Sequence, residues 1–236
     1  MIHRMPVALL AATLLGAAQP ALAADALSSS YWDAAYLNAK VDTGSGDELT
    51  PEGFRLGASV GLAKFLNFTG DYDQRRYPGQ REGFGSAGFA GHTSNPVYRF
   101  HGAVTYERIE FDDNVTPAND YIEEGFGVEL GARYAFPDIE VHAAYRYLDF
   151  GSVNGTGGAV DFTGARYGVG ADVQLTAWWS LVADYRVREH KNEASGSSST
   201  TDYNEWTVGF RRYFASDTDR LMRHGGLFNG DEDAAE

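Results

Sequence analysis

A strict alternation of apolar with polar residues recurs in ten segments of this chain, and it constrains the fold more than any other feature. It is clearest towards the end of the sequence. There the even-numbered positions from Trp206 to Phe214 are apolar except for Arg212, and the odd-numbered positions from Glu205 to Arg211 are polar or glycine. A β-strand points successive side chains to opposite faces. Each segment is therefore predicted to be a strand with one apolar and one polar face.

Most of the alternating segments are about ten residues long, which is the length that a tilted strand needs to cross a bilayer. The fourth segment is rich in glycine and has the weakest alternation, so the prediction is ten strands, with eight as the alternative. The segments are residues 31–41, 54–62, 65–77, 83–91, 98–107, 122–136, 139–147, 164–175, 179–188 and 203–214.

Short and long connections alternate between the predicted strands, and only the link at 78–80 is short where a long one is expected. Transmembrane β-barrels have short periplasmic turns and longer external loops, whereas a soluble β-sandwich has no reason to sort its loops. The chain is therefore predicted to be all-β: an antiparallel up-and-down barrel whose apolar faces meet lipid and whose polar faces line a lumen. The short links are 63–64, 93–96, 137–138 and 176–177, and the long ones are 42–52, 112–120, 151–158 and 191–202.

The two ends of the chain are predicted to lie outside this barrel. Arg4, the apolar run after it and the small-x-small sequence Ala21-Leu22-Ala23 indicate a secretory signal peptide at residues 1–23. The barrel would then occupy residues 24–214, and residues 215–236 would form an acidic, flexible tail. The chain has no cysteine, which excludes a disulfide framework, and its net charge of −14 argues against a nucleic-acid partner.

The last strand resembles the closing strand of bacterial outer-membrane β-barrels, which the barrel-assembly machinery reads as a sorting signal. Thr207, Gly209 and Phe214 match that pattern, while Arg212 stands where a bulky apolar residue is usual. Together with the signal peptide and the sorted loops, this makes the chain similar to the small Gram-negative outer-membrane β-barrel family, both OmpA-like and OmpX-like, and its porin-like branches. The resemblance implies a place in the cell outer membrane, among lipid and lipopolysaccharide, and recognition by the assembly machinery.

The polar faces carry arginines and acidic residues in nearly equal number. Charges removed from bulk water must be paired or hydrated, and a small barrel is just wide enough for side chains to fill it. The sequence therefore predicts a narrow or occluded lumen crossed by arginine–carboxylate pairs, with alternating glycines in 122–136 and 164–175 leaving room for them. The predicted lumen charges are Arg55, Asp71, Asp73, Arg75, Arg99, Glu107, Glu129, Arg133, Arg146, Arg166, Asp172, Asp184, Arg186, Glu205 and Arg211.

Aromatic residues gather near the ends of the apolar faces, where the two membrane interfaces are expected. Tyr and Trp prefer this region because the ring lies in hydrocarbon while the polar group reaches water. The predicted interface aromatics are Phe136, Trp178, Trp179 and Phe214 on the periplasmic side and Tyr72, Tyr106, Tyr147 and Tyr185 on the outer side, together with Trp206.

The predicted function is that of a non-catalytic barrel, which serves envelope structure, slow diffusion of small solutes or surface contacts through its loops. No enzyme activity, metal site or cofactor is predicted, because the histidines are scattered without a pair at metal-ligand spacing.

The alternative is a surface hydrolase. Ten strands is also the count of the omptin proteases, and Asp71, Asp73, Asp184 and His190 could be assigned to catalytic positions. The Asp–His spacing differs from that family's, and the predicted strands are shorter than its tall barrel requires. A lipid A deacylase or phospholipase barrel would need a lipid-facing His beside a Ser.

Both of the histidines that could serve such an enzyme, His101 and His142, are predicted to face the lumen. Hydrogen-bonded filling of the lumen is therefore the expected role of these two side chains.

Overall fold

The computed structural model of this chain is a closed antiparallel barrel of ten strands with one extra two-residue strand, so the eight-stranded alternative is wrong. It describes residues 30–42, 48–63, 65–93, 95, 97–115, 120–136, 139–155, 158–176, 178–194 and 197–214. The predicted signal peptide and acidic tail lie outside these residues. The strands are β1 (Tyr31–Asp42), β2 (Glu48–Leu49), β3 (Glu52–Ala63), β4 (Leu66–Tyr77), β5 (Gln80–His92), β6 (Tyr98–Asp113), β7 (Tyr121–Ala135), β8 (Ile139–Gly155), β9 (Gly158–Gln174), β10 (Trp179–Ala194) and β11 (Ser197–Tyr213).

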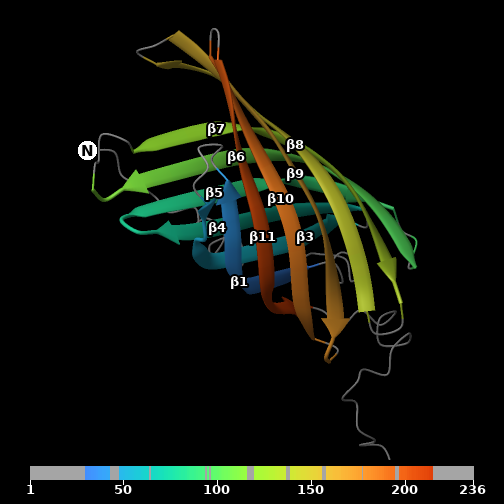
Figure 1. Cartoon of the computed structure of the whole chain (residues 1–236). Helices are drawn as coiled ribbons and strands as arrows, with labels where there is room; N and C mark the ends of the chain where they lie inside the picture. Colours follow the sequence, from blue (N-terminus) through green and yellow to red (C-terminus); the bar gives the residue numbers. More distant parts are fainter. Residues whose placement is uncertain are drawn as a thin grey trace, which may run out of the picture.

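The barrel closes because the last long strand pairs with the first. Every other long strand pairs with its neighbours in the sequence, and β11 lies beside β1, as Figure 1 shows for the red and blue strands. The closing register runs from Tyr31 opposite Tyr213 to Asp42 opposite Asp202. Lipid offers no hydrogen bonds to an open sheet edge, so closure is what makes such a sheet compatible with a bilayer. No helix in the described ranges is long and apolar enough to cross a membrane.

The two faces of the strands differ in exposure as the alternation predicts. In β7, Phe126, Val128 and Leu130 are each more than half exposed, whereas Gly127 between them is buried. The outer surface is therefore apolar and the interior polar, the reverse of a soluble domain. A continuous apolar surface of this kind needs lipid around it.

Several strands are longer than predicted. β8 and β11 each have 17 residues, and β10 has 16. The stretches 151–158 and 191–202, which the sequence predicts as loops, therefore mostly continue the paired strands. Along 191–200 the backbone pairing persists while the alternation ends, and Lys191, Glu193 and residues 198–200 are exposed. β2 likewise occupies part of the predicted loop 42–52, where Leu49 pairs with Val41.

An apolar cluster lies inside the barrel towards the end with the long hairpins, where the sequence predicts a polar inner face. At its centre Leu37 is fully buried, and Phe84, Leu148 and Phe150 are less than a tenth exposed. Tyr77 and Phe162 pack against it. We refer to this cluster as the inner apolar layer; its members are Leu37, Ala39, Val41, Phe84, Ile109, Leu148, Phe150 and Tyr203.

Candidate functional site

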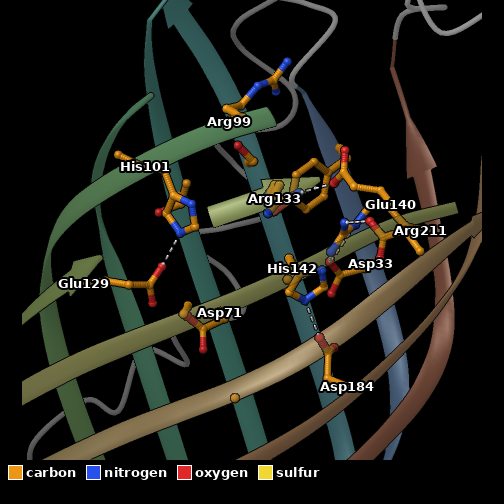
Figure 2. A pocket seen from close by; sticks show the side chains of 18 of the residues that line it. Asp33, Asp71, Arg99, His101, Glu129, Arg133, Glu140, His142, Asp184 and Arg211 are labelled. Atoms are coloured by element: carbon orange, nitrogen blue, oxygen red, sulfur yellow. Dashed lines mark hydrogen bonds and ion pairs between the residues drawn. The ribbon is translucent and has the colours of Figure 1, made fainter. Parts of the chain in front are cut away.

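A cavity of about 230 Å³ occupies the half of the lumen at the end with the short turns. Its lining reaches the rim at Val97 and Phe136 and extends inward to Asp71 and Arg186. In transmembrane barrels the short turns face the periplasm. We call this cavity the vestibule; Figure 2 shows the side chains that line it.

Two histidines of the vestibule each contact a carboxylate on another strand. The His101 Nε2 atom lies 3.1 Å from the Glu129 Oε1 atom, and the His142 Nε2 atom lies 2.8 Å from the Asp184 Oδ1 atom. These histidines therefore face the lumen, as the sequence predicts, and each is hydrogen-bonded within it.

The predicted role of the alternating glycines, to leave room for arginine and glutamate side chains, is confirmed at Gly127, where an added Cβ atom would lie 2.7 Å from the Glu107 carboxylate and 3.1 Å from the Cδ atom of Arg146. A Cβ atom added at Gly131 would lie 2.2 Å from the Cε1 atom of His101, and one added at Gly170 would lie 2.3 Å from the Asp184 carboxylate. Any side chain at these positions would occupy the space of the histidine or the acid. The absence of a side chain on β7 and β9 thus makes room for the polar groups of the vestibule.

Two ion-pair groups hold the walls of the vestibule together near its mouth. The Arg211 guanidinium donates to Asp33, at 2.9 Å, and to Asp172, so it joins β11 to β1 and to β9. The Arg133 guanidinium donates to Glu140 at 3.0 Å, across the turn between β7 and β8. Because Asp33, Asp172 and Arg211 are almost fully buried, leaving any of these charges unpaired would be costly.

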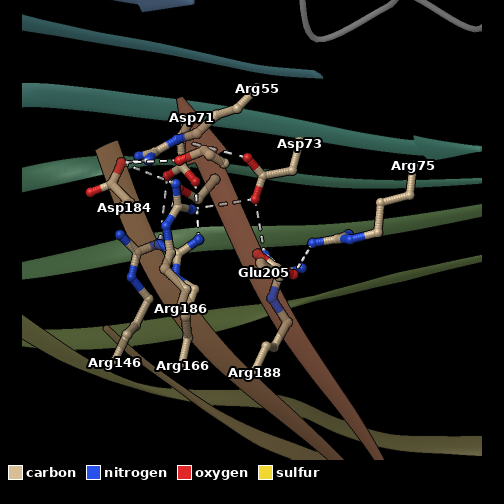
Figure 3. A network of polar contacts seen from close by, with 12 residues as sticks. Arg55, Asp71, Asp73, Arg75, Arg146, Arg166, Asp184, Arg186, Arg188 and Glu205 are labelled. Carbon is tan, nitrogen blue, oxygen red and sulfur yellow. Dashed lines mark hydrogen bonds and ion pairs between the residues drawn. The ribbon is translucent and has the colours of Figure 1, made fainter. Parts of the chain in front are cut away.

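A dense belt of charges crosses the barrel at the inner end of the vestibule, as Figure 3 shows. The Asp71 carboxylate accepts a hydrogen bond from Arg166 at 3.1 Å and lies 3.7 Å from Arg146. Arg146 also donates to Glu107 at 2.8 Å and contacts Glu129 at 2.7 Å. These contacts connect β4, β6, β7, β8 and β9 across the lumen.

The belt continues on the opposite wall. Asp73 accepts a hydrogen bond from Arg188 at 3.0 Å, and the Arg75 guanidinium donates to Glu205. Arg55 donates to Asp184 at 3.1 Å. All of these pairs join residues that are far apart in the sequence, so the belt ties the wall of the barrel together from the inside.

The belt is covered on its outer side by the inner apolar layer. The guanidinium carbons of Arg188 and Arg75 lie 3.8 Å and 4.4 Å from the centre of the Phe84 ring, a cation–π geometry. Above them, the Glu82 carboxylate accepts hydrogen bonds from the hydroxyls of Tyr77 and Tyr203, each at 2.9 Å. A second cavity between the belt and this layer has a volume of only about 10 Å³.

The structure places the predicted lumen charges on the inner face of the barrel. Arg99 lines the vestibule mouth, and the other predicted charges lie in the vestibule walls or in the belt, with the contacts given above. Five further buried or vestibule charges are absent from the predicted list: Asp33, Glu82, Asp113, Glu140 and Arg188. Glu140 and Arg188 continue the polar alternation of their strands, so the signal for these two was present in the sequence.

The predicted interface aromatics lie on the outer face of the barrel, except Phe136, which stands at the rim and also lines the mouth of the vestibule. Trp206 and Phe136 are about half exposed, while Trp179 is partly covered. The guanidinium of Arg212 lies over the ring of Trp179, 5.6 Å from the ring centre. The arginine that departs from the closing-strand pattern therefore contacts an aromatic ring. Their position at the membrane interfaces remains a prediction.

The residues considered for catalysis are not arranged as a catalytic pair. Asp184 contacts His142 and Arg55. His190 lies six residues further along β10 and packs against Phe84 and Tyr203. Six residues of strand span roughly 20 Å. Within the described part of the chain, no three His, Asp or Glu side chains are grouped so that they could hold a metal ion. The strands were expected to be shorter than an omptin-like barrel requires, and this was wrong, because β8 to β11 each have 16 or 17 residues. Strand length therefore does not argue against a tall barrel.

Comparison with known proteins gives a family. A model of the family described as "Outer membrane protein beta-barrel domain" matches residues 8–214, and no curated protein matches the sequence. Neisserial surface protein A is similar in structure, with 17% identity, a TM-score of 0.37, and coverage of 78% of this chain and 97% of that chain.

Two further solved structures cover a similar share of the chain. The outer membrane protease OmpT from Escherichia coli has 9% identity, a TM-score of 0.47, and coverage of 79% of this chain and 97% of its own. The attachment invasion locus protein Ail of Yersinia pestis has 10% identity, a TM-score of 0.36, and coverage of 78% and 96%. By the family match across residues 8–214, this chain belongs to the outer-membrane β-barrel family and is a protein of the outer membrane.

Proposed function

We propose that the protein is a non-catalytic outer-membrane barrel whose lumen forms no open pore. It would serve the envelope through its surface, by contact of the barrel wall with lipid and lipopolysaccharide and through its external hairpins. The observation that carries this proposal is the filling of the lumen beyond the vestibule. Both the charge belt and the inner apolar layer span that region, and the cavity between them, about 10 Å³, is near the smallest that holds one water molecule.

The packing explains why such a lumen would resist solutes. A solute moving outward from the vestibule would have to separate buried ion pairs such as Arg75 with Glu205, both of which are fully buried. Breaking one buried pair costs roughly 3–5 kcal/mol. It would then have to displace Phe84, which is held between two arginines. Passage of hydrated ions would therefore be rare.

Conductance across planar lipid bilayers tests this proposal. The refolded full chain should insert, as shown by heat-modifiable migration on gels, and should give no stepwise conductance, while a general porin in the same bilayer provides the positive control. Regular conductance steps from the inserted protein would refute the closed lumen.

Activity assays on the same preparation test the absence of catalysis. Incubation with lipid A, phospholipid and peptide substrates should release no product. A hydrolase would release product at a rate that falls when Asp184 or His142 is replaced, and that result would replace the proposed function by the enzymatic alternative.

A further inference from the structure

The hairpin of β4 and β5, two strands that lie side by side in Figure 1, ends low on the outer side of the barrel. Its turn consists of Pro78 and Gly79 alone, and the positive φ of Gly79, 79°, lets the chain reverse at once. The two strands have 12 and 13 residues, whereas those of the β10–β11 hairpin have 16 and 17. The outermost side chains of the β4–β5 hairpin are therefore not covered by a long loop of their own.

The outermost outward-facing pair on this hairpin is Arg76 opposite Arg81. From Leu66 to Arg76, β4 makes ten residue steps, which cover roughly 33 Å along the strand. A tilt of about 40° reduces this length to a height of about 25 Å, which is the height of the apolar band of a transmembrane barrel. With Leu66 at the periplasmic edge of that band, the two arginines lie at its outer edge, where the lipid headgroups begin.

These two exposed arginines lack an anion of the chain beside them. Directly opposite residues on one face of a sheet have Cβ atoms about 5 Å apart, and like charges there destabilise the sheet. Among the residues that the structure describes, neither guanidinium forms an ion pair or a hydrogen bond. Glu52 stands opposite Arg76 on β3 but interacts with the Tyr36 hydroxyl, and Asp112, opposite Arg81 on β6, forms no ion pair with it. The pair therefore has an unmet demand for an anion.

The same face of the hairpin is apolar below the arginines. Phe68 of β4 lies opposite Phe89 of β5 on the periplasmic side, with ring centres 5.5 Å apart. Between these rings and the arginines, β5 presents only small residues outward, Gly83, Gly85 and Ala87. We call this face the β4–β5 strip; it consists of Phe68, Gly70, Tyr72, Gln74, Arg76, Arg81, Gly83, Gly85, Ala87 and Phe89. The strip is thus apolar over most of its length and cationic at its outer end.

Tyr72 and Gln74 contribute neutral polar groups just below the arginines. The Tyr72 side chain reaches across to β5, since a Cβ atom added at Gly83 would lie 2.8 Å from the tyrosine hydroxyl. This hydroxyl also interacts with the Gln74 side chain. Guanidinium groups bind phosphate with paired hydrogen bonds, and hydroxyl and amide groups can add further ones. The strip therefore has the order of groups found along a phosphorylated lipid, with hydrocarbon below and phosphate above.

We propose that the β4–β5 strip binds a phosphorylated lipid of the outer leaflet. Its phosphate lies between Arg76 and Arg81, and its acyl chains lie along the wall below. In an outer membrane this lipid is lipopolysaccharide, held through its lipid A anchor. The inference rests on the proposed function, because it names the place where the barrel wall contacts lipopolysaccharide. The two can fail separately: conductance or hydrolysis would leave this binding intact, and loss of the binding would leave the lumen closed.

Titration with lipid A tests the proposal. The full chain, refolded in a neutral detergent, would be titrated with lipid A, and native mass spectrometry would count the bound lipids and give the Kd. The unchanged protein should bind one lipid A molecule. Arg76→Gln and Arg81→Gln should each raise the Kd about tenfold, and the double variant about a hundredfold, because a hydrogen bond to a charged group contributes about one power of ten.

Arg108→Gln is the matched control. Arg108 also lies on the outer face at this end, on β6, but Glu110 at 2.7 Å and Glu124 at 2.9 Å already pair with it, so its replacement should leave the Kd unchanged. The double variant with lysine at 76 and 81 should retain part of the affinity, since the charge is kept and the paired geometry is lost. Because Arg76 and Arg81 are exposed and unpaired, their replacement should not lower stability in detergent without lipid A.

Two further probes separate the lipid from its phosphate. Dioleoylphosphatidic acid should displace lipid A, whereas dioleoylglycerol, which has the same chains without the phosphate, should not. Inorganic phosphate that displaces lipid A as effectively as phosphatidic acid would show an anion site without lipid recognition and would overturn the proposal. The proposal also fails if the Arg76, Arg81 double glutamine variant binds lipid A as tightly as the unchanged protein, or if Arg108→Gln weakens binding as much. A loss of stability without lipid A in that double variant would assign the arginines to the fold instead.

Discussion

Replacing Glu205 by alanine should be among the most damaging single changes to the stability of this barrel. Glu205 is fully buried and accepts a hydrogen bond from Arg75, and a second guanidinium, that of Arg188, lies 3.8 Å away. Removing one partner of a buried ion pair costs roughly 3–5 kcal/mol, because the remaining charge is left without compensation.

The structure places the expected loss at the lower end of this range. After Glu205→Ala, Arg188 keeps Asp73 at 3.0 Å, while Arg75 keeps Glu82, at 4.0 Å, and the rings of Phe84 and Tyr203. One guanidinium is therefore poorly compensated rather than two. We expect the free energy of unfolding to fall by about 3 kcal/mol.

Reversible unfolding in guanidinium chloride from lipid vesicles would measure the change, with tryptophan fluorescence as the signal and linear extrapolation to zero denaturant. The matched control is Glu124→Ala. Glu124 also pairs with an arginine, Arg108 at 2.9 Å, but its side chain is half exposed. A surface ion pair contributes less than about 1 kcal/mol.

A double variant distinguishes an unpaired charge from a lost contact. Arg75→Met with Glu205→Leu removes both charges and fills most of the space, so it should recover stability to within about 1 kcal/mol of the unchanged protein. The reasoning fails if Glu205→Ala costs no more than Glu124→Ala. It also fails if the double variant is as unstable as the single one, since then packing and not charge would explain the loss.

Three further changes test other parts of the fold. Val128→Arg on the outer face should lower the free energy of unfolding in vesicles by about 2–4 kcal/mol, and a smaller loss than 1 kcal/mol would mean that this face does not meet hydrocarbon. Gly209→Ala should prevent heat-modifiable folding, because its Cβ atom would lie 2.1 Å from the Ala34 carbonyl oxygen, while Gly102→Ala, with its nearest contact at 3.5 Å, should fold normally. Phe84→Ala should cost about 3–5 kcal/mol in the same unfolding assay, and a loss below 1 kcal/mol would show that the inner apolar layer is not tightly packed.

The fold was predictable from the sequence because each strand in lipid has two unlike environments. In β11 the lipid-facing positions Trp206, Val208 and Phe210 are apolar, Arg212 lies against an aromatic ring, and the inward positions from Glu205 to Arg211 are polar or glycine. The two-residue alternation therefore predicts both that the segment is a strand and which side chains face lipid or the lumen. Strand length was less predictable, because that contrast ends at the membrane surface while β8 and β10 continue.

The inner apolar layer escaped prediction for a physical reason. Ile109 and Leu148 occupy inward positions just beyond the ends of the predicted segments. From the sequence alone, an apolar residue there can belong either to a layer inside the barrel or to an external loop. The pairing within the belt was equally inaccessible. Arg55 and Asp184 are 129 positions apart, and their contact depends on the register and tilt of the strands between them.

The pairing of β1 with β11 sets the order in which this protein can be made. Asp33 in the first strand pairs with Arg211, which lies 178 positions later in the sequence, so this ion pair forms only after the last strand has been made. Lipid tolerates no open sheet edge, so a nascent or prematurely terminated chain has no smaller barrel to form. The complete polypeptide must therefore be exported and kept from aggregating before the barrel can close. A stop codon upstream of the last strand would give a chain that is degraded, and no shortened barrel would form in the membrane.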